Sequence, residues 1–242
     1  MSEAEGPIDP ALERLLAEAS QEEAEPEGGP DLAPVFEEIQ ARIGEAEGRR
    51  SFWLATRPTR VRRAICWGTL ALVALLGGVL TLRADFGDYP LPRMMAALGA
   101  LFVLGGLSLH HALRPVHQPP LPRWVGALVV LAALGATFTL ALLPPAHAGG
   151  LEGVGAHGAA PCLLYGLLFG LPVYGMLRVL DRGGGSPAPL LGASAAGLAG
   201  NLVLQLHCPQ TDPTHLLAGH FAVAALFIGG IGLIHLVTRR AR

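Results

Sequence analysis

Between two long apolar runs the chain carries one short polar stretch, LQLHCPQTDPTHLLAGH, at Leu204–His220. The apolar runs on its two sides each hold about twenty residues, which is the length that crosses a bilayer as a helix. The Pro and Asp residues of the stretch favour turns, and backbone within lipid must satisfy its own hydrogen bonds. The stretch therefore predicts two antiparallel membrane helices joined by a short polar loop.

The rest of the chain repeats this pattern. Only 15% of its 242 residues are charged, which is too few to cover the surface of a soluble domain of this length. Hydropathy predicts an all-α fold, a polytopic membrane bundle of six transmembrane helices. The predicted spans are Ala64–Leu82, Met94–Leu113, Trp124–Leu143, Ala160–Leu180, Ala188–Leu206 and Leu216–Val237.

The distribution of arginines predicts how the bundle is oriented. All seventeen basic residues are Arg. If the N-terminus is cytoplasmic, thirteen Arg residues flank the spans on the inner side, and only Arg83 and Arg93 lie on the outer side. Cytoplasmic loops are the ones that carry an excess of positive charge. We therefore expect a multi-pass protein of a bacterial inner membrane with both termini in the cytoplasm and with Leu204–His220 facing the periplasm.

The chain divides into a polar tail, residues 1–63, and a transmembrane domain, residues 64–242. Met1–Gly48 is acidic, with fourteen Asp or Glu residues against two Arg, and an Arg-rich juxtamembrane segment follows. Five apolar residues share one stripe of a predicted helix that the tail is too small to bury, so we expect them to bind in the groove of a soluble, basic partner. The alternative is a partly disordered solubilising tail. The partner-binding candidates are Leu32, Val35, Phe36, Ile39 and Ile43.

The polar stretch contains residue types that bind transition metals. Zinc or copper requires three or four His, Cys or carboxylate ligands that converge on one point. The candidate ligands are His207, Cys208, His215 and His220, with His147, His157 and Cys162 as possible additions. Their spacing matches no strong signature such as paired CxxC motifs, and histidines are common at membrane interfaces. A metal site is thus one of two hypotheses for this loop.

The second hypothesis is redox sensing by two thiols. Cys162 and Cys208 lie at the outer ends of neighbouring predicted spans, so their Cα atoms could approach the separation that a disulfide needs. On the periplasmic side the environment is oxidising. The alternative is that both are unpaired small apolar residues.

The interiors of the spans argue against transport. No Asp, Glu or Arg lies in the middle of any predicted span, whereas ion-coupled transporters and pumps usually keep such groups there. We expect Asn201 and Gln205 to form interhelical hydrogen bonds. Small residues predict close packing of the helices around them: Gly166, Gly170, Ala193, Gly197 and Gly200.

Several of these features together resemble a known family. The segment WLATRPTRVRRA before the first span, six short spans and LHCP at the end of the fifth span are similar to the NrsF-type membrane anti-sigma factors, of which the six-span CarR is a similar example. The resemblance implies that the cytoplasmic tail holds an extracytoplasmic-function sigma factor until a signal releases it to RNA polymerase. It also implies a periplasmic cysteine pair, matched here by Cys162 and Cys208. The long acidic tail and the histidines His215 and His220 depart from the family pattern.

The sequence as a whole predicts a regulator and not an enzyme. It implies a sigma factor and the lipid bilayer as partners, no direct contact with nucleic acid and no obligatory cofactor. The alternative function is a membrane metal-binding protein or metalloenzyme that uses the periplasmic His and Cys residues with zinc or copper. A small transporter is a second alternative, weakened by the uncharged spans.

Overall fold

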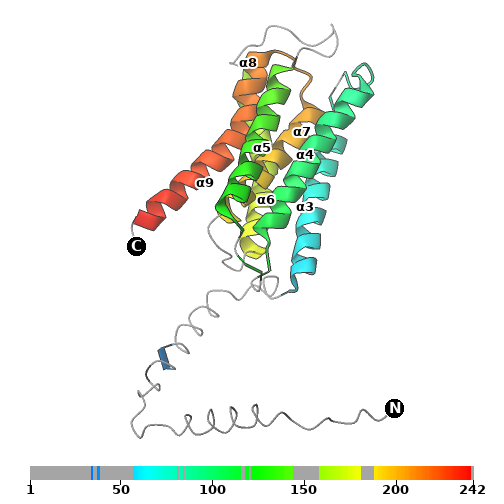
Figure 1. Ribbon diagram of the computed structural model, residues 1–242. Helices are drawn as coiled ribbons and strands as arrows, with labels where there is room; N and C mark the ends of the chain where they lie inside the picture. Colours follow the sequence, from blue (N-terminus) through cyan, green and yellow to red (C-terminus); the bar gives the residue numbers. More distant parts are fainter. Residues whose placement is uncertain are drawn as a thin grey trace, which may run out of the picture. The chain divides into compact units, whose positions relative to one another are not determined.

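The fold is seen in a computed structural model (Figure 1). It describes residues 34, 37–38, 57–80, 82–83, 85–115, 118–119, 121–143, 158–180 and 188–240. The chain divides into two units, Met1–Ser51 and Phe52–Arg242. In the first unit Pro34, Glu37 and Glu38 are helical and exposed. The partner-binding candidates of the tail, Leu32, Val35, Phe36, Ile39 and Ile43, lie outside the described residues.

In its described residues the second unit has six helices that are long and apolar enough to span a membrane. The predicted bundle of six spans is therefore confirmed, and the chain is built as a multi-pass membrane protein, all-helical in its described spans. The last span consists of three consecutive segments, α8, the π-helical turn η2 and α9. The bounds are α3 (Thr59–Leu80), α4 (Leu91–Ala112), α5 (Arg123–Leu142), α6 (Ala159–Leu180), α7 (Ala188–His207), α8 (Pro213–Leu216), η2 (Leu217–Phe221) and α9 (Ala222–Arg240).

Helix α3 begins earlier than hydropathy predicts. Its first turn is started by Pro58, whose carbonyl accepts the backbone N–H groups of Val61 and Arg62. Residues 59–63, which the sequence assigns to the juxtamembrane segment, thus belong to the helix. Arg62 is 1% exposed, and its guanidinium donates to the carbonyl of Leu180 at the end of α6. A buried cation therefore satisfies a terminal carbonyl of another helix.

Helix α7 is the centre of the bundle and contacts each of the other long helices. In its apolar segment 78% of the residues are buried, against 17–33% in the other five spans. Figure 1 shows α3, α4, α5, α6 and the α8–α9 span arranged around it. The side chains of α3, α4 and α5 are correspondingly exposed on their outer faces, as expected of surfaces that face lipid.

Glycines allow α6, α7 and α9 to pack closely. A Cβ atom at Gly200 of α7 would collide with the backbone carbonyl of Gly166 of α6, and one at Gly197 would lie 2.7 Å from the Cα of Ala224 of α9. The predicted close packing at these glycines is confirmed. Asn201, by contrast, donates within its own helix to the carbonyl of Gly197, 2.9 Å away, so the interhelical hydrogen bond predicted for it is not formed.

The two ends of the bundle differ in character. At one end, where α6 begins and α7 ends, lie Cys162 and Cys208; we call this the thiol end. At the other end, where α3 begins and α6 ends, lie Arg62 and Leu180; we call this the arginine end. Helix α6 runs the whole distance between the two ends.

Candidate thiol and metal site

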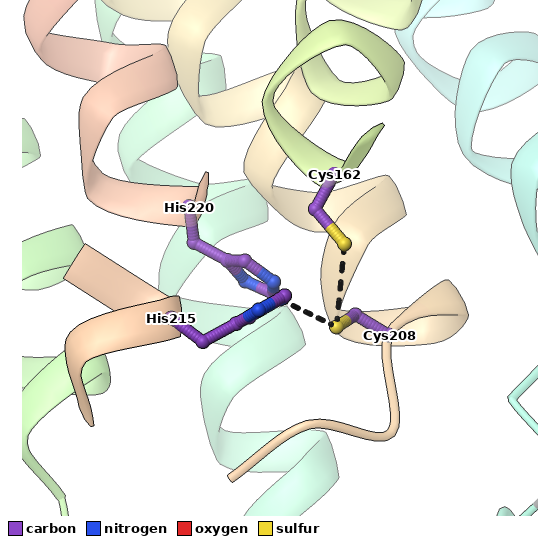
Figure 2. Close-up of side chains that lie close together, drawn as sticks. All are labelled: Cys162, Cys208, His215 and His220. Atoms are coloured by element: carbon purple, nitrogen blue, oxygen red, sulfur yellow. Dashed lines mark hydrogen bonds between the residues drawn. The ribbon is translucent and has the colours of Figure 1, made fainter. Parts of the chain in front are cut away.

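Four buried or half-buried side chains converge at the thiol end. Cys162 comes from the first turn of α6, Cys208 directly follows α7, His215 lies on α8, and His220 lies in the π-helical turn. One ligand atom from each of these residues lies within 4.8 Å of the other three. Figure 2 shows both imidazoles directed toward the two sulfurs. We call these four residues the thiol–imidazole cluster.

The distances within the cluster approach those of a tetrahedral metal site. The Sγ atoms of Cys162 and Cys208 are 3.6 Å apart, and the Sγ of Cys208 is 3.4 Å from the Nε2 of His215. In a tetrahedral zinc site the usual bond lengths separate two sulfurs by about 3.8 Å and sulfur from nitrogen by about 3.6 Å. These two separations would need to increase by only about 0.2 Å to match such a site.

The imidazoles are buried without a full set of hydrogen-bond partners. His215 is 1% exposed and His220 is 3% exposed. Within the part of the chain that the structure describes, the Nδ1 of His215 and both ring nitrogens of His220 have no hydrogen-bond partner. Burying such nitrogens unpaired costs free energy. A metal ion that takes the one nitrogen lone pair of each ring would remove part of that cost.

Local sequence explains how the loop places its ligands. The backbone N–H of Cys208 still bonds to the carbonyl of Leu204, so Cys208 extends the last turn of α7. Asp212 then caps α8, because its carboxylate accepts the backbone N–H of Thr214 at 2.7 Å and that of His215 at 3.4 Å. Pro213 occupies the first helical position, where its missing N–H is harmless. The motif DPTH therefore fixes His215 in the first turn of α8.

A buried arginine lies beside the cluster. Arg83 is 5% exposed and forms two hydrogen bonds with the carboxylate of Asp85, at 2.5 and 2.7 Å. Its guanidinium also lies 4.4 Å from the ring centre of Tyr89, and its backbone N–H bonds to Leu206. A small cavity lined by Arg83, Cys208 and His220 adjoins the cluster. The sequence identifies Arg83 only as an outer arginine, because its pairing depends on a loop that closes over α7.

The two thiols share a hydrogen bond. The hydrogen bond with Cys162, followed by burial, raises the pKa of the Cys208 thiol above its ordinary value. Within the described residues all three cysteines are free. The arrangement suits two reactions, formation of one disulfide and coordination of one soft or borderline metal ion.

The structure brings together most of the residues that the sequence singles out. Cys162 and Cys208, the predicted redox pair, are adjacent. Of the predicted metal ligands, Cys208, His215 and His220 join the cluster, whereas His207 does not. The ring of His207 instead stacks on Tyr165, with 4.4 Å between the ring centres. Its place is taken by Cys162, which the sequence suggests only as an addition; His147 and His157 lie outside the described residues.

Comparison with known proteins decides the family. A family model described as NrsF, negative regulator of sigma F, matches residues 48–239, which is more than half of the chain. The chain belongs to the NrsF family. The resemblance found in the sequence is thereby confirmed. No curated protein and no solved structure matches the chain.

Membership of the NrsF family sets the class of function. The family name describes a negative regulator of a sigma factor, so the family is regulatory and is not a family of enzymes. The matched range includes all six spans and the whole thiol–imidazole cluster. It begins after the five partner-binding candidates of the tail.

Proposed function

We propose that this NrsF-family protein is a membrane anti-sigma factor of a bacterial inner membrane. Its cytoplasmic tail, residues 1–63, sequesters an extracytoplasmic-function sigma factor, and its transmembrane domain, residues 64–242, controls the release. Both termini lie in the cytoplasm, and the thiol end faces the periplasm. The family match supports the sigma-factor partner, and the excess of Arg residues at the arginine end supports the orientation.

One observation supports the sensory role above all others. Four Cys and His side chains, three of them buried, converge at the thiol end, while the first helix of the bundle, α3, begins at the arginine end. In the proposed orientation the cluster faces the periplasm and the first span begins on the cytoplasmic side, as transmembrane signalling requires. A signal at the cluster must stabilise one arrangement of the helices over another, or nothing is transmitted.

Thiol oxidation is the first signal that we propose. A peroxide, ROOH, is attacked by one thiolate of the pair, which becomes a sulfenic acid while the O–O bond breaks and an alcohol leaves. The second thiol then displaces water from the sulfenic acid, and the Cys162–Cys208 disulfide forms. The peroxide accepts both electrons. The two sulfurs, now 3.6 Å apart, must approach to about 2.05 Å, which draws the first turn of α6 toward the end of α7.

Metal binding is the second candidate, favoured by the near-tetrahedral distances and by the unpartnered imidazole nitrogens. Two thiolates and two imidazoles suit zinc or monovalent copper. The cluster supplies four protein ligands, whereas catalytic zinc sites keep one position open for water. This argues for a metal sensor and against the metalloenzyme that the sequence leaves open.

The test uses the full-length chain in the membrane of a bacterium. We expect a single sigma factor, identified by mass spectrometry, to copurify with the chain. Phe36→Asp with Ile39→Asp places charges on the proposed binding stripe and should abolish copurification. Gln40→Asp adds a charge beside the stripe and serves as the control.

The amount of chain in the membrane is measured in parallel, because the wild type and the two variants should insert equally. Copurification of the same sigma factor with the double variant would show that the tail stripe is not the binding surface. Absence of any sigma factor from the wild-type sample would contradict the proposed function itself.

A further inference from the structure

The segment between α8 and α9 has an unusual backbone. Leu217–Phe221 forms one turn of π-helix, and the backbone N–H of Ala222 bonds to the carbonyl of Leu217, five residues earlier. Such turns are rare, and they occur mostly as single turns inside α-helices at functional sites. This one carries His220 and directly follows the segment that carries His215.

The π-turn is what brings the two histidines together. Five residues apart on an α-helix, two side chains point about 140° away from each other. A turn that closes from residue i to i+5 returns them to one face. The rings of His215 and His220 accordingly lie with their centres 6.1 Å apart, and both face the two cysteines (Figure 2).

The helix after the π-turn is held in a fixed register. Val223 packs closely against Gly166 of α6, where a Cβ atom would lie only 2.6 Å from its side chain. Phe227 packs in the same way against Gly170. Farther along α9 the packing is looser, because a Cβ atom at Gly229 or Gly230 would meet no neighbouring atom. Figure 1 shows α9 leaning away from the bundle toward its C-terminal end. The first two turns of α9 therefore fix its rotation.

Helix α8, which precedes the π-turn, is fixed less firmly than the first two turns of α9. Helix α8 consists of four residues, Pro213–Leu216. It is anchored by the Asp212 cap and by the contact between His215 and Cys208. If the π-turn rewound as an α-helix, α8 would be the part that turns, by about 100° for the one residue gained. That rotation would carry His215 away from Cys208.

We infer that the π-turn Leu217–Phe221 is a ligand-linked switch. An ion held by Cys162, Cys208, His215 and His220 binds only the π-helical form and so stabilises it; without the ion the turn passes back and forth between the π-helical and the α-helical form. This inference rests on the metal binding proposed above. Gly219 connects the switch to α6, since a Cβ there would lie 3.3 Å from both the carbonyl oxygen of Ala159 and the Cβ of Cys162. The form of the turn thus sets the contact surface at the beginning of α6.

Deletion of Ala218 separates ligand binding from switching. It leaves His215 and His220 four residues apart, and an α-helix places such residues on one face. The shortened chain should therefore still bind Zn²⁺ with the same stoichiometry, now on a continuous α-helix that has no second form. The His207→Gln chain, altered outside the cluster, is the control.

The readout is backbone amide hydrogen exchange of the peptide that covers Leu217–Phe221, measured on the full-length chain in detergent with and without Zn²⁺. In the wild type and in His207→Gln we expect Zn²⁺ to slow exchange about tenfold or more, because the bound ion stops the passage between the two forms, during which the amides lose their hydrogen-bond partners. In the deletion variant we expect slow exchange under both conditions. Equal exchange of the wild-type peptide with and without bound Zn²⁺ would overturn the switch, whether or not the deletion variant folds.

The same samples distinguish the inference from the proposals beneath it. If the wild-type chain binds Zn²⁺ without a change in hydrogen exchange, only the proposed switch is refuted. If the wild-type chain binds no Zn²⁺, the proposed switch and the proposed metal site are both refuted. Copurification of the sigma factor, scored separately, reports on the anti-sigma function in either case.

Discussion

Arg62 and Leu180 join the first turn of α3 to the last residue of α6. The Nη1 of Arg62 donates to the carbonyl oxygen of Leu180 over 2.7 Å, and its Nη2 donates to the Oγ1 of Thr59 over 3.0 Å. The guanidinium is buried at the arginine end, where α6 leaves its final carbonyl groups without partners in its own helix. Helix α6 is thus tied to α3 at one end and carries Cys162 at the other.

Replacement of Arg62 should destabilise the bundle. Arg62→Ala leaves the Leu180 carbonyl unpaired and opens a cavity, so we expect a loss of roughly 2 kcal/mol or more in the free energy of unfolding. Arg60→Ala removes an exposed arginine of the same turn and should cost far less. Unfolding in mixed detergent micelles measures both. Equal losses of unfolding free energy for the two variants would mean that the Arg62–Leu180 hydrogen bond does not stabilise the bundle.

Oxidation should consume two thiols of the three. With the full-length chain in detergent, a stoichiometric peroxide should protect Cys162 and Cys208 together from alkylation and leave Cys66 reactive after denaturation. Cys162→Ser or Cys208→Ser should abolish the disulfide, because either change removes one sulfur of the adjacent pair. Cys66→Ser is the control and should oxidise like the wild type. A disulfide that involves Cys66 would contradict the assignment.

Metal binding should follow the cluster and not the sequence proximity of the histidines. We expect one Zn²⁺ or Cu⁺ per chain, removable by a chelator. His215→Gln and His220→Gln should each weaken binding at least about tenfold, since each removes one of four ligands. His207→Gln changes the residue next to Cys208, yet it should bind normally because His207 stacks on Tyr165. Elemental analysis with competitive titration measures the three affinities, and weak binding by His207→Gln alone would refute this ligand set.

Helix packing should depend on Gly200. Gly200→Ala places a methyl group against the backbone carbonyl of Gly166, and a backbone atom cannot move aside as a side chain can. We expect a loss of about 1–3 kcal/mol in the free energy of unfolding, as for other overpacked interiors. Gly99→Ala is matched in chemistry but meets no neighbouring atom, so it should be neutral or slightly stabilising. A loss at Gly200 no larger than the effect at Gly99 would contradict the prediction and show that the α6–α7 contact tolerates the extra methyl group.

The sequence predicts the spans well because each is a continuous apolar segment of bilayer length, a local property. It predicts less well where arginine enters a helix: hydropathy begins the first span at Ala64, whereas Thr59 begins α3 because Arg62 finds its partner at Leu180. That partner lies 118 residues away, and no local pattern reports it.

In the candidate site, too, the sequence predicts what is local and misses what depends on long-range contacts. Cys208, His215 and His220 are visible as candidates because they share one loop. The exchange of His207 for Cys162 depends on the stacking of His207 on Tyr165 and on the approach of α6 to α7. The π-turn is invisible in the sequence, because an α-helical reading places His215 and His220 on different faces. The partner-binding stripe of the tail stays a prediction.

The central position of α7 has a consequence for how the protein is made. It is the least apolar of the six spans and the one most enclosed by its neighbours, yet it is fifth in chain order. During synthesis the first four spans enter the bilayer before the helix around which they will pack. They must therefore wait as loosely associated neighbours, and the final architecture forms only when α7 and the α8–α9 span arrive as a hairpin. Assembly is completed by the same hairpin whose loop brings Cys208, His215 and His220 to Cys162.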